Sequence, residues 1–570
     1  MLLGLHGVSG VADGEALWCF GCTSVDWLSC VHVNDVARLF LSVAAPGMSR
    51  AAVGLAVVPL IAALRLLYRR IYHQRCNASE DSSPTTLDPT NWDDMRANAH
   101  ALLDAAIDKM KSANEGRVWN PVPNEFKSML KVPIPMSGIS HDELRGRLQS
   151  LLPYGSGNTH PRFFGWVQGS GCPGGVLAEM VGSAMNVNAG GRDHAAIYVE
   201  RQVLSWCREM LGFPPEAGGL LVSGTSLATI LALKTARDRA LGFAASRKYG
   251  LCSANGHGAL VGYAAEGTHS CVKRAFDVLG LGSDSLRMVP VTDQYMMDVT
   301  KLAAMIEEDR RAGRRPFVLV GTAGSVNVGA VDDLNALADL ATAQKLWFHV
   351  DGAFGAVAVL SPVAKPLLAG LERASSVAFD FHKWLHVGYE AGCILVRDPG
   401  DHLEAFHERP DYLSPKTRGL GAGDWWPCDY GIELSRGFRA LKVWAHFLEH
   451  GTQKLGAAIS ANLAQAKYLA ELVDASPELS RVAPVTLQIV CFRYVPPNTA
   501  LSLESLASLN DEIVLELQEQ GIAAPSTTKI QGHTAIRVNL TNHRTRTEDI
   551  RLLVDATVRI GRELSAKSSR

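Results

Sequence analysis

The feature that most constrains this chain is an alternation of short apolar runs with helical patterns between about residues 218 and 400. Apolar runs typical of strands occupy residues 220–224, 259–266, 317–324, 346–353, 375–381 and 392–397. Apolar residues recur at helical spacing in 225–242, 269–280 and 334–345. Strands that alternate with helices predict an α/β fold whose mainly parallel sheet is covered on both faces.

Polar side chains stand where these predicted strands end. In open α/β sheets, ligands bind beyond the carboxyl ends of the strands. The residues at those positions are Thr225, Ser226, Thr268, His269, Ser325, Asp351, His382 and Lys383. We therefore expect the functional site to be built from this set.

The remainder of the chain differs from this central region. After about residue 450 a helix is predicted at 453–474, strands at 486–495 and 534–542, and further helices at 502–521 and from Thr547. This order is typical of a smaller α+β domain. We expect an N-terminal extension at 1–86, a helical segment at 87–165, a large domain at 166–450 and a small C-terminal domain at 451–570.

The extension contains two apolar runs, 39–48 and 51–64, followed by an arginine-rich segment that ends at Arg75. Each run is shorter than the roughly 20 residues that a spanning helix needs, and Arg50 separates them. Two interpretations stay open: a membrane tether through residues 39–75, with the arginines and the catalytic body on the cytoplasmic side, or a loose extension. In both cases we expect a cytoplasmic location.

Charge and cysteine content exclude several classes of function. Lys and Arg total 55 against 57 Asp and Glu, so no basic excess indicates nucleic-acid binding. The 11 cysteines are odd in number and scattered, which disfavours a disulfide framework. Cys19 and Cys22 form one CxxC pair, but no second pair stands at metal spacing. We therefore expect no metal in the functional site.

Four of the strand-end residues suggest specific chemistry. Thr225 and Ser226 open a helix after Ser-Gly and could cradle a phosphate, or simply cap the helix. Asp351 ends an apolar strand, where a carboxylate needs a cation or hydrogen-bond donors. Lys383 lies between Phe381 and Trp384, where desolvation would make it a Schiff-base amine, although it could equally extend to water.

His269 opens a helix and could stack on a ring, or be an ordinary capping histidine. A phosphate cradle, a carboxylate for a ring nitrogen, a stacking imidazole and an amine for an aldehyde together suit pyridoxal 5′-phosphate as cofactor.

The chain resembles the group II pyridoxal-phosphate-dependent amino-acid decarboxylases, which include the aromatic-L-amino-acid decarboxylases. The resemblance covers about residues 88–565. It is carried by HPRFFGWV (160–167), YVERQVLSWCREMLGFP (198–214), GGLLVSGTSLATILALKTAR (218–237), HSCVKRAFDVLG (269–280), HVDGAFG (349–355), DFHKWLHVGYEAGCILVRD (380–398) and ELSRGFRALKVW (433–444). It implies fold-type I, with a seven-stranded, mainly parallel sheet in the large domain, a small C-terminal domain, and a homodimer whose active site lies at the interface.

The resemblance also implies a role for each matching residue. Lys383 resembles the lysine that binds the cofactor, Asp351 the partner of the ring nitrogen, His269 the imidazole on one ring face and Ala353 the contact on the other. Thr225, Ser226 and His382 stand where the family holds the phosphate, with Asp380 as a further contact. Tyr412 matches a mobile-loop tyrosine that protonates Cα and reaches the other subunit's site.

The implied function is decarboxylation of an L-amino acid, with an aromatic substrate such as tryptophan or tyrosine leading, to an amine and CO2. Within the same fold the alternatives are a decarboxylase of glutamate or another small amino acid, and an aldehyde synthase or lyase. Outside enzymes the alternative is a catalytically silent scaffold. The aromatic strip Phe163, Phe164 and Trp166 fits an aromatic substrate, but these residues could equally be core.

Overall fold

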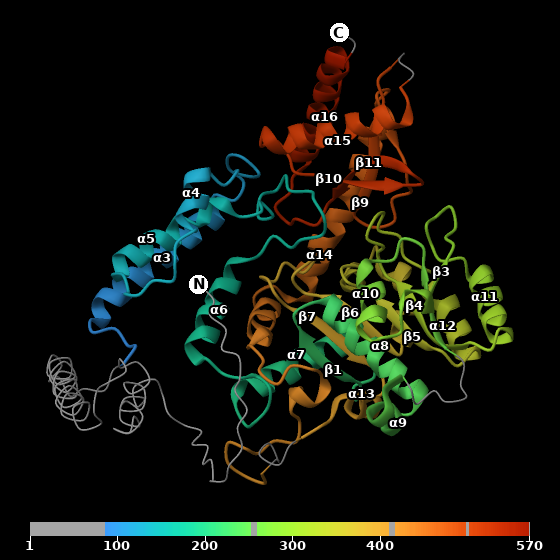
Figure 1. Ribbon diagram of the computed structural model, residues 1–570. Coiled ribbons are helices and arrows are strands. Elements are labelled where there is room, and N and C mark those ends of the chain that lie inside the picture. The colour runs from blue at the N-terminus through green and yellow to red at the C-terminus, as the bar shows by residue number, and fades with distance from the viewer. Residues whose placement is uncertain (1–85, 252–258, 410–415, 498–500, 569–570) are drawn as a thin grey trace, which may run out of the picture. The chain divides into compact units, whose positions relative to one another are not determined.

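A seven-stranded sheet carries the large domain (Figure 1). In spatial order its strands are β1 (Gly218–Val222), β7 (Gly392–Val396), β6 (Ser376–Asp380), β5 (Trp347–Asp351), β4 (Arg315–Thr322), β2 (Leu260–Ala265) and β3 (Leu286–Val289). Only β7 pairs antiparallel with its neighbours; the pairs from β6 to β3 are parallel. The predicted α/β fold with a mainly parallel sheet is confirmed.

The computed structural model describes residues 86–251, 259–409, 416–497 and 501–568. Residues 92–570 form one unit, and the first unit, residues 1–91, is described only from residue 86 onward. The predicted apolar runs at 39–64, the CxxC pair and Tyr412 therefore lie outside the described residues.

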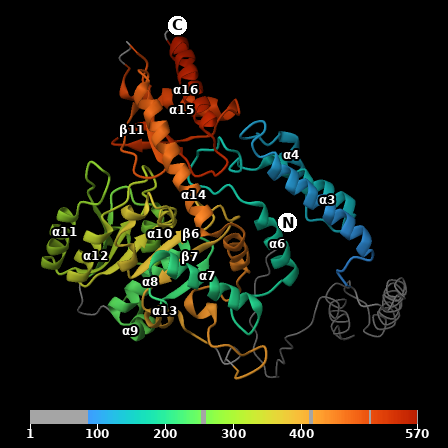
Figure 2. The ribbon, with the colours of Figure 1, turned by 180° about the vertical axis from the view of Figure 1, so that it is seen from behind.

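The central strands are buried on both faces, as parallel strands sandwiched by helices must be. One face packs against α7 (Ala195–Leu211), α11 (Val299–Arg311), α12 (Leu334–Ala343) and the start of α14 (Arg439–Ala475). The other face packs against α8 (Thr225–Leu241) and α10 (Ser270–Val278). The short helices α9 (Phe243–Tyr249) and α13 (Pro399–Phe406) contact α8 (Figure 2).

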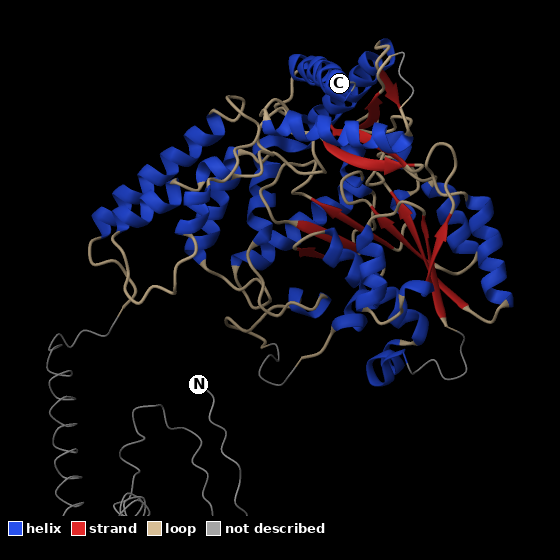
Figure 3. Ribbon diagram, turned by 45° about the horizontal axis from the view of Figure 1, so that its top comes forward, coloured by secondary structure: helices blue, strands red, loops and turns tan. Residues whose placement is uncertain are grey.

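A second, antiparallel sheet forms the small C-terminal domain (Figure 3). Its strand order is β10 (Ser526–Ile530), β11 (His533–Asn539), β9 (Ile489–Tyr494) and β8 (Leu479–Arg481). It packs against α15 (Leu503–Glu519), α16 (Thr547–Ser568) and the end of α14. Helix α14 thus belongs to both cores, and it kinks at Gly451, whose φ of 65° suits glycine. The predicted domain boundary after residue 450 stays a prediction, since residues 92–570 form one compact unit.

Helices α3 (Trp92–Lys111), α4 (Asn124–Met129) and α5 (His141–Gln149) precede the large domain, and α6 (Pro173–Met185) leads into it. Together α3, α4 and α5 bury a single residue, Asn98. Within the described ranges, no helix combines the length and apolar character needed to cross a membrane.

Three strands escaped prediction, namely β3, β8 and β10. They are short, and β3 and β10 carry polar residues such as Arg287, Thr527 and Lys529. Each is an edge strand of its sheet, where one side of the backbone has no strand partner and an apolar run is not needed. Edge position depends on tertiary packing, so local sequence could not reveal it.

Candidate active site

The segment after β6 places a lysine and a carboxylate side by side. The Nζ atom of Lys383 lies 2.8 Å from Oδ2 of Asp380, a side chain that is only 2% exposed. The other oxygen of Asp380 accepts the backbone N–H of Thr225 at the start of α8, with 2.7 Å between nitrogen and oxygen. One buried carboxylate therefore fixes both the lysine-bearing turn and a helix N-terminus.

Asp351 provides a second buried carboxylate, at the end of β5. Its Oδ1 accepts the backbone N–H of Ala353 at 3.2 Å, and the Cys271 thiol lies 3.8 Å from its Oδ2. Burial raises the pKa of Asp351, while the positive charge of Lys383 opposes that rise. A cationic N–H group placed against this carboxylate would replace the water that it has lost.

His269 is the N-cap residue of α10, and its Nδ1 accepts the backbone N–H of Cys271 at 3.2 Å. The surrounding protein lowers the pKa of His269 by desolvation, although the nearby Asp351 carboxylate acts in the opposite direction. The ring is therefore neutral near pH 7, and a neutral ring can lie flat on an aromatic ligand without the cost of desolvating a charge. Capping and ligand contact are compatible, because capping uses only Nδ1.

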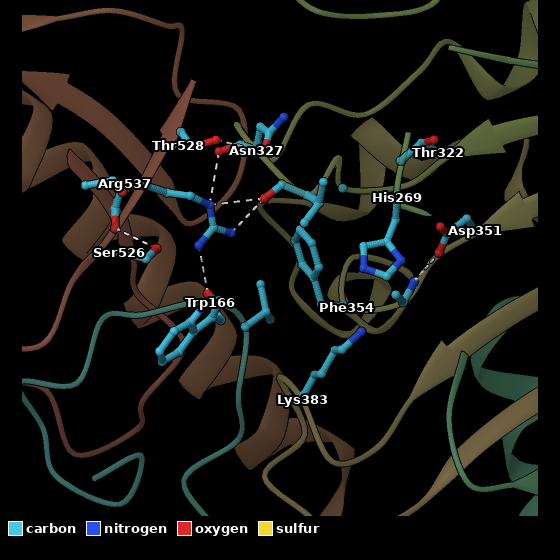
Figure 4. Close-up of a pocket in the computed structure, with 15 residues that line it drawn as sticks. Trp166, His269, Thr322, Asn327, Asp351, Phe354, Lys383, Ser526, Thr528 and Arg537 are labelled. Atoms are coloured by element: carbon cyan, nitrogen blue, oxygen red, sulfur yellow. Dashed lines mark hydrogen bonds between the residues drawn. The ribbon is translucent and has the colours of Figure 1, made fainter. Parts of the chain in front are cut away.

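A cavity of about 280 Å³ brings four of the predicted residues together. His269, Asp351, Ala353 and Lys383 all line it. Figure 4 shows His269, Asp351 and Lys383 on one side and Arg537, Ser526 and Thr528, from the small domain, on the other. The sheet edge and the small domain thus enclose one shared space.

The residues predicted to hold the phosphate, Thr225, Ser226 and His382, do not line this cavity. Asp380 contacts both Thr225 and the cavity residue Lys383. Thr225 is buried, and its Oγ1 has no hydrogen-bond partner among the described residues. Ser226 is exposed on the next position of α8. The buried His382 has its Nδ1 2.8 Å from the carbonyl oxygen of Ala391.

Glycines keep the backbone close around the lysine-bearing turn. A Cβ atom on Gly169 would lie 2.5 Å from the carbonyl oxygen of His382, and one on Gly392 would lie 2.6 Å from Oδ1 of Asp380. Both distances are shorter than any real contact, so only glycine fits either position.

These residues fit pyridoxal phosphate. The unpaired hydroxyl of Thr225, with a second unpaired hydroxyl on Thr322 in the cavity wall, supplies donors that a polar ligand would satisfy. The α8 N-terminus favours an anion. The carboxylate of Asp380 would repel a phosphate, so its contacts suit it to positioning Lys383 and Thr225 rather than to direct phosphate binding.

Sequence reasoning missed Arg537, which lines the cavity from β11 and is 4% exposed. Its guanidinium donates to the carbonyl oxygens of Val326 and Trp166, at 2.7 and 2.9 Å. Burial lowers the pKa of Arg537 to about 10, which still leaves it charged at neutral pH. The available signal was a charged residue inside the otherwise apolar strand pattern TAIRVNL.

The aromatic strip is divided by the structure. Phe163 and Phe164 are core residues, 5% and 0% exposed. Trp166 is 59% exposed and lines the cavity together with Phe354. The strip therefore contributes one aromatic wall residue, and Phe354 supplies a second.

The chain is similar to known pyridoxal-dependent decarboxylases. Residues 123–495 match the model of the pyridoxal-dependent decarboxylase conserved domain. An aromatic-L-amino-acid decarboxylase from Bacillus atrophaeus is 33% identical, over 80% of this chain and 93% of its own length. A tryptophan decarboxylase from Oryza sativa subsp. japonica is 28% identical, over 79% of this chain and 91% of its own length. Among solved structures, Oryza sativa TDC with PLP and tryptamine superimposes with a TM-score of 0.76 and 27% identity, covering 84% of this chain and 100% of that one.

Proposed function

Because the chain belongs to the pyridoxal-dependent decarboxylase family, it is an amino-acid carboxy-lyase that uses pyridoxal phosphate, and we propose that its substrates are aromatic L-amino acids of the tryptophan or tyrosine type. The observation that carries the proposal is the convergence of Lys383, Asp351 and His269 on one cavity whose far wall includes Trp166. The products would be CO2 and an aromatic amine. Relatives with tryptophan and tyrosine decarboxylase names support the substrate class.

We assign the predicted residues to roles at this cavity. Lys383 would bind the cofactor covalently through Nζ, and Asp351 would hold a proton on the ring nitrogen. His269 and Ala353 would contact the two ring faces. When bound, pyridoxal phosphate accepts the electron pair left by the broken Cα–carboxyl bond.

A second group would hold the phosphate, from outside the cavity lining. Thr225 has a buried hydroxyl available to donate, Ser226 follows it at the same helix N-terminus, and His382 lies in the lysine-bearing turn. Asp380 would hold Lys383 and the Thr225 N–H in register.

The proton that replaces CO2 on Cα needs a donor. We assign it to Tyr412, which lies outside the described residues, on the strength of the sequence resemblance alone. The exchange balances: Cα loses CO2, gains one proton from the tyrosine hydroxyl, and the hydroxyl regains a proton from solvent. Trp166 and Phe354 would keep bulk water from the reacting carbon.

A second substrate class has one observation in its favour. Arg537 places a buried positive charge at the cavity wall, and no carboxylate pairs with it among the described residues. Such a charge attracts an anionic group, which suits the substrate's own carboxylate or the side chain of glutamate. An acidic amino acid is therefore the competing proposal.

A screen of the twenty amino acids for CO2 release decides between the two. Purified protein loaded with pyridoxal phosphate should release CO2 and the matching amine fastest from tryptophan, tyrosine or phenylalanine. Faster release from glutamate or aspartate would overturn the aromatic assignment, and no release from any amino acid would favour the silent scaffold.

We further propose a homodimer with the active site at its interface. The face of α6 exposes the large apolar side chains of Leu177, Met180, Val181 and Met185, by 41–54%. Contiguous exposed apolar surface of this kind marks interaction sites in soluble proteins. Light scattering on the eluted protein should give twice the chain mass; a monomer that is fully active would contradict the proposal.

The cytoplasmic location and the tether through residues 39–75 stay proposals, since those residues lie outside the described ones. The test is to compare the full chain with a chain that starts at residue 87. Sedimentation with membranes by the full chain alone would support a tether, and equal solubility of both would refute it.

A further inference from the structure

A cluster of imidazole and thiol groups lies outside the lining of the cavity that holds Lys383. The ligand atoms of Cys172, His446 and His450 all lie within 4.8 Å of one another. Next to this group, Nε2 of His543 lies 3.9 Å from the Cys172 sulfur and 3.4 Å from the carbonyl oxygen of Gly171. None of these four residues lines the cavity that holds Lys383.

We infer that Cys172, His446 and His450 form a structural zinc site, whose fourth ligand is His543 once its Nε2 turns away from the carbonyl oxygen of Gly171. Zinc binds thiolate and imidazole at about 2.0–2.3 Å in tetrahedral geometry, which separates ligand atoms by roughly 3.3–3.8 Å. The observed separations of up to 4.8 Å exceed this range by at most about 1.5 Å, a gap that side-chain rotations close.

The two histidines on α14 have the spacing that a helix needs to chelate a metal. His446 and His450 are four residues apart and lie on one face, as in known helical zinc motifs. His446 is only 4% exposed, and its Nε2 has no hydrogen-bond partner among the described residues. Its other ring nitrogen is held by the backbone of Leu385, the arrangement that orients a metal-binding histidine.

The nitrogen Nε2 of His450 is likewise buried and lacks a hydrogen bond in the described part of the chain. A buried donor or acceptor left without a partner costs about 1–3 kcal/mol, so two such nitrogens facing one thiol call for a ligand. Cys172 is the N-cap residue of α6, and burial raises the pKa of its thiol to about 11, so zinc itself must displace the proton from the sulfur. On binding, the Cys172 S–H releases its proton to solvent and the sulfur bonds the metal.

Three charged side chains lie near this cluster. The carboxylate of Glu449 lies 3.6 Å from Nε2 of His450 and offsets part of the metal's charge. The ammonium of Lys454 lies 3.4 Å from Nδ1 of the same ring, but it belongs to an exposed side chain that can move to water. Arg544 donates to the carbonyl oxygens of Ser170 and Gly171, which keeps its charge directed at those oxygens.

The segment that carries Cys172 is hydrogen-bonded to the lysine-bearing turn. The hydroxyl of Ser170 lies 3.2 Å from Nδ1 of His386, and Gly169 donates its N–H to the carbonyl oxygen of His382. The chain that carries Cys172 is thus bonded on both sides of Lys383. Zinc held by Cys172 and α14 would brace the lysine-bearing turn from behind without entering the reaction.

The test uses the full chain with its cofactor bound. After treatment with a chelator and dialysis, zinc is titrated against a fluorescent competitor, and the bound metal is counted by mass spectrometry. We expect one zinc per chain and a higher melting temperature with zinc. Cobalt added in place of zinc should give a thiolate charge-transfer band. This band is seen when the spectrum of the cofactor-loaded protein without cobalt is subtracted from the spectrum with cobalt.

Variants assign the metal to these residues. Cys172→Ser and His450→Ala should each weaken zinc binding by at least about tenfold, because even outer-shell partners of metal ligands contribute that much. His543→Ala should weaken it less, since water can take its place. Cys428→Ser, at another half-buried cysteine, and the double variant Cys19→Ser/Cys22→Ser should bind zinc as the parent does.

Two results would overturn the inference. The first is that the parent protein, shown to be folded by its circular dichroism spectrum, binds no zinc at micromolar zinc concentrations. The second is unchanged zinc binding in both Cys172→Ser and His450→Ala, or loss of zinc in the Cys19→Ser/Cys22→Ser variant. If His446→Ala fails to fold, the two partly exposed ligands Cys172 and His450 still decide the question.

Discussion

Lys383 and Asp380 form an ion pair, with 2.8 Å between Nζ and Oδ2, although they are separated by only two residues in a turn. Because Asp380 also accepts the Thr225 N–H, the pair ties the end of β6 to the start of α8. The amine is therefore positioned at the cavity before any ligand arrives, at the edge where the parallel strands end.

Lys383→Ala should abolish the visible absorbance of bound cofactor and lower CO2 release by roughly a thousandfold or more, because no other amine lies in the described cavity wall. Borohydride reduction followed by peptide mass analysis locates the attachment. The exposed Lys301→Ala is the matched control. Retained absorbance in Lys383→Ala would disprove the assignment.

Asp351→Asn keeps the shape of the side chain and removes its charge. We expect kcat to fall about 10²- to 10³-fold, the size of a lost electrostatic contact in an active site, with cofactor content measured in parallel. Asp309→Asn removes a carboxylate that is equally buried but lies outside the cavity. That control should lose stability rather than kcat, and an equal loss of kcat in both would refute a specific role for Asp351.

Tyr412→Phe should still release CO2 but divert product from amine to aldehyde. In that route the substrate's amino group leaves as ammonia, water supplies the aldehyde oxygen, and O2 takes up two electrons and two protons to become hydrogen peroxide. Product analysis by chromatography and a peroxide assay measure the switch. Amine as the sole product of Tyr412→Phe would remove the tyrosine from the role of proton donor.

Mixing that variant with Lys383→Ala tests whether the loop acts on the other subunit. A hybrid dimer contains one intact Lys383 and one intact Tyr412, on different chains. Amine formation should return in the mixture if the loop crosses the interface, whereas a loop that serves its own subunit leaves the mixture without amine.

Glu200 and Arg436 form a buried ion pair, with side chains 2% and 1% exposed and 2.6 Å between Oε1 and Nη2. Glu200→Gln should destabilise the fold by about 3–5 kcal/mol, because it leaves the arginine charge buried and unpaired. Urea unfolding measures this, with the exposed pair partner Glu143→Gln as control, expected to cost less than about 1 kcal/mol. The double variant Glu200→Leu/Arg436→Met should recover part of the loss; a further loss in it would argue against charge burial as the cause.

His349 makes stability depend on acid. Complete burial lowers its pKa to about 3, below the ordinary 6.5. Between these two pH values the histidine is protonated in the unfolded chain but neutral in the folded chain. The contribution of His349 to the free energy of unfolding is therefore fully present above pH 6.5, and it falls by up to about 1.4 kcal/mol per pH unit as pH drops toward 3. In His349→Gln the urea midpoint should fall less steeply as pH drops, because unfolding then takes up one proton fewer. In the control His100→Gln, whose histidine is exposed, the slope should match that of the parent. Identical slopes for parent and His349→Gln would contradict the assignment.

Sequence by itself determined the class of fold and the chemistry. Six strands could be predicted from their apolar runs, because strands buried on both faces must be continuously apolar: β1, β2, β4, β5, β6 and β7. The strand-end rule then singled out Asp351 and Lys383, since a charge at the end of a buried run has few structural explanations.

Only the tertiary structure decided what faces these residues. Arg537 reaches the cavity from β11, and Cys172 meets His446 and His450 from a distant part of the chain. Local patterns carry no information on which loop closes over which strand end, because such contacts arise from the packing of two domains through α14. The periodicity of apolar residues indicates which side of a helix or strand is buried. Only the tertiary structure shows which other element packs against that side.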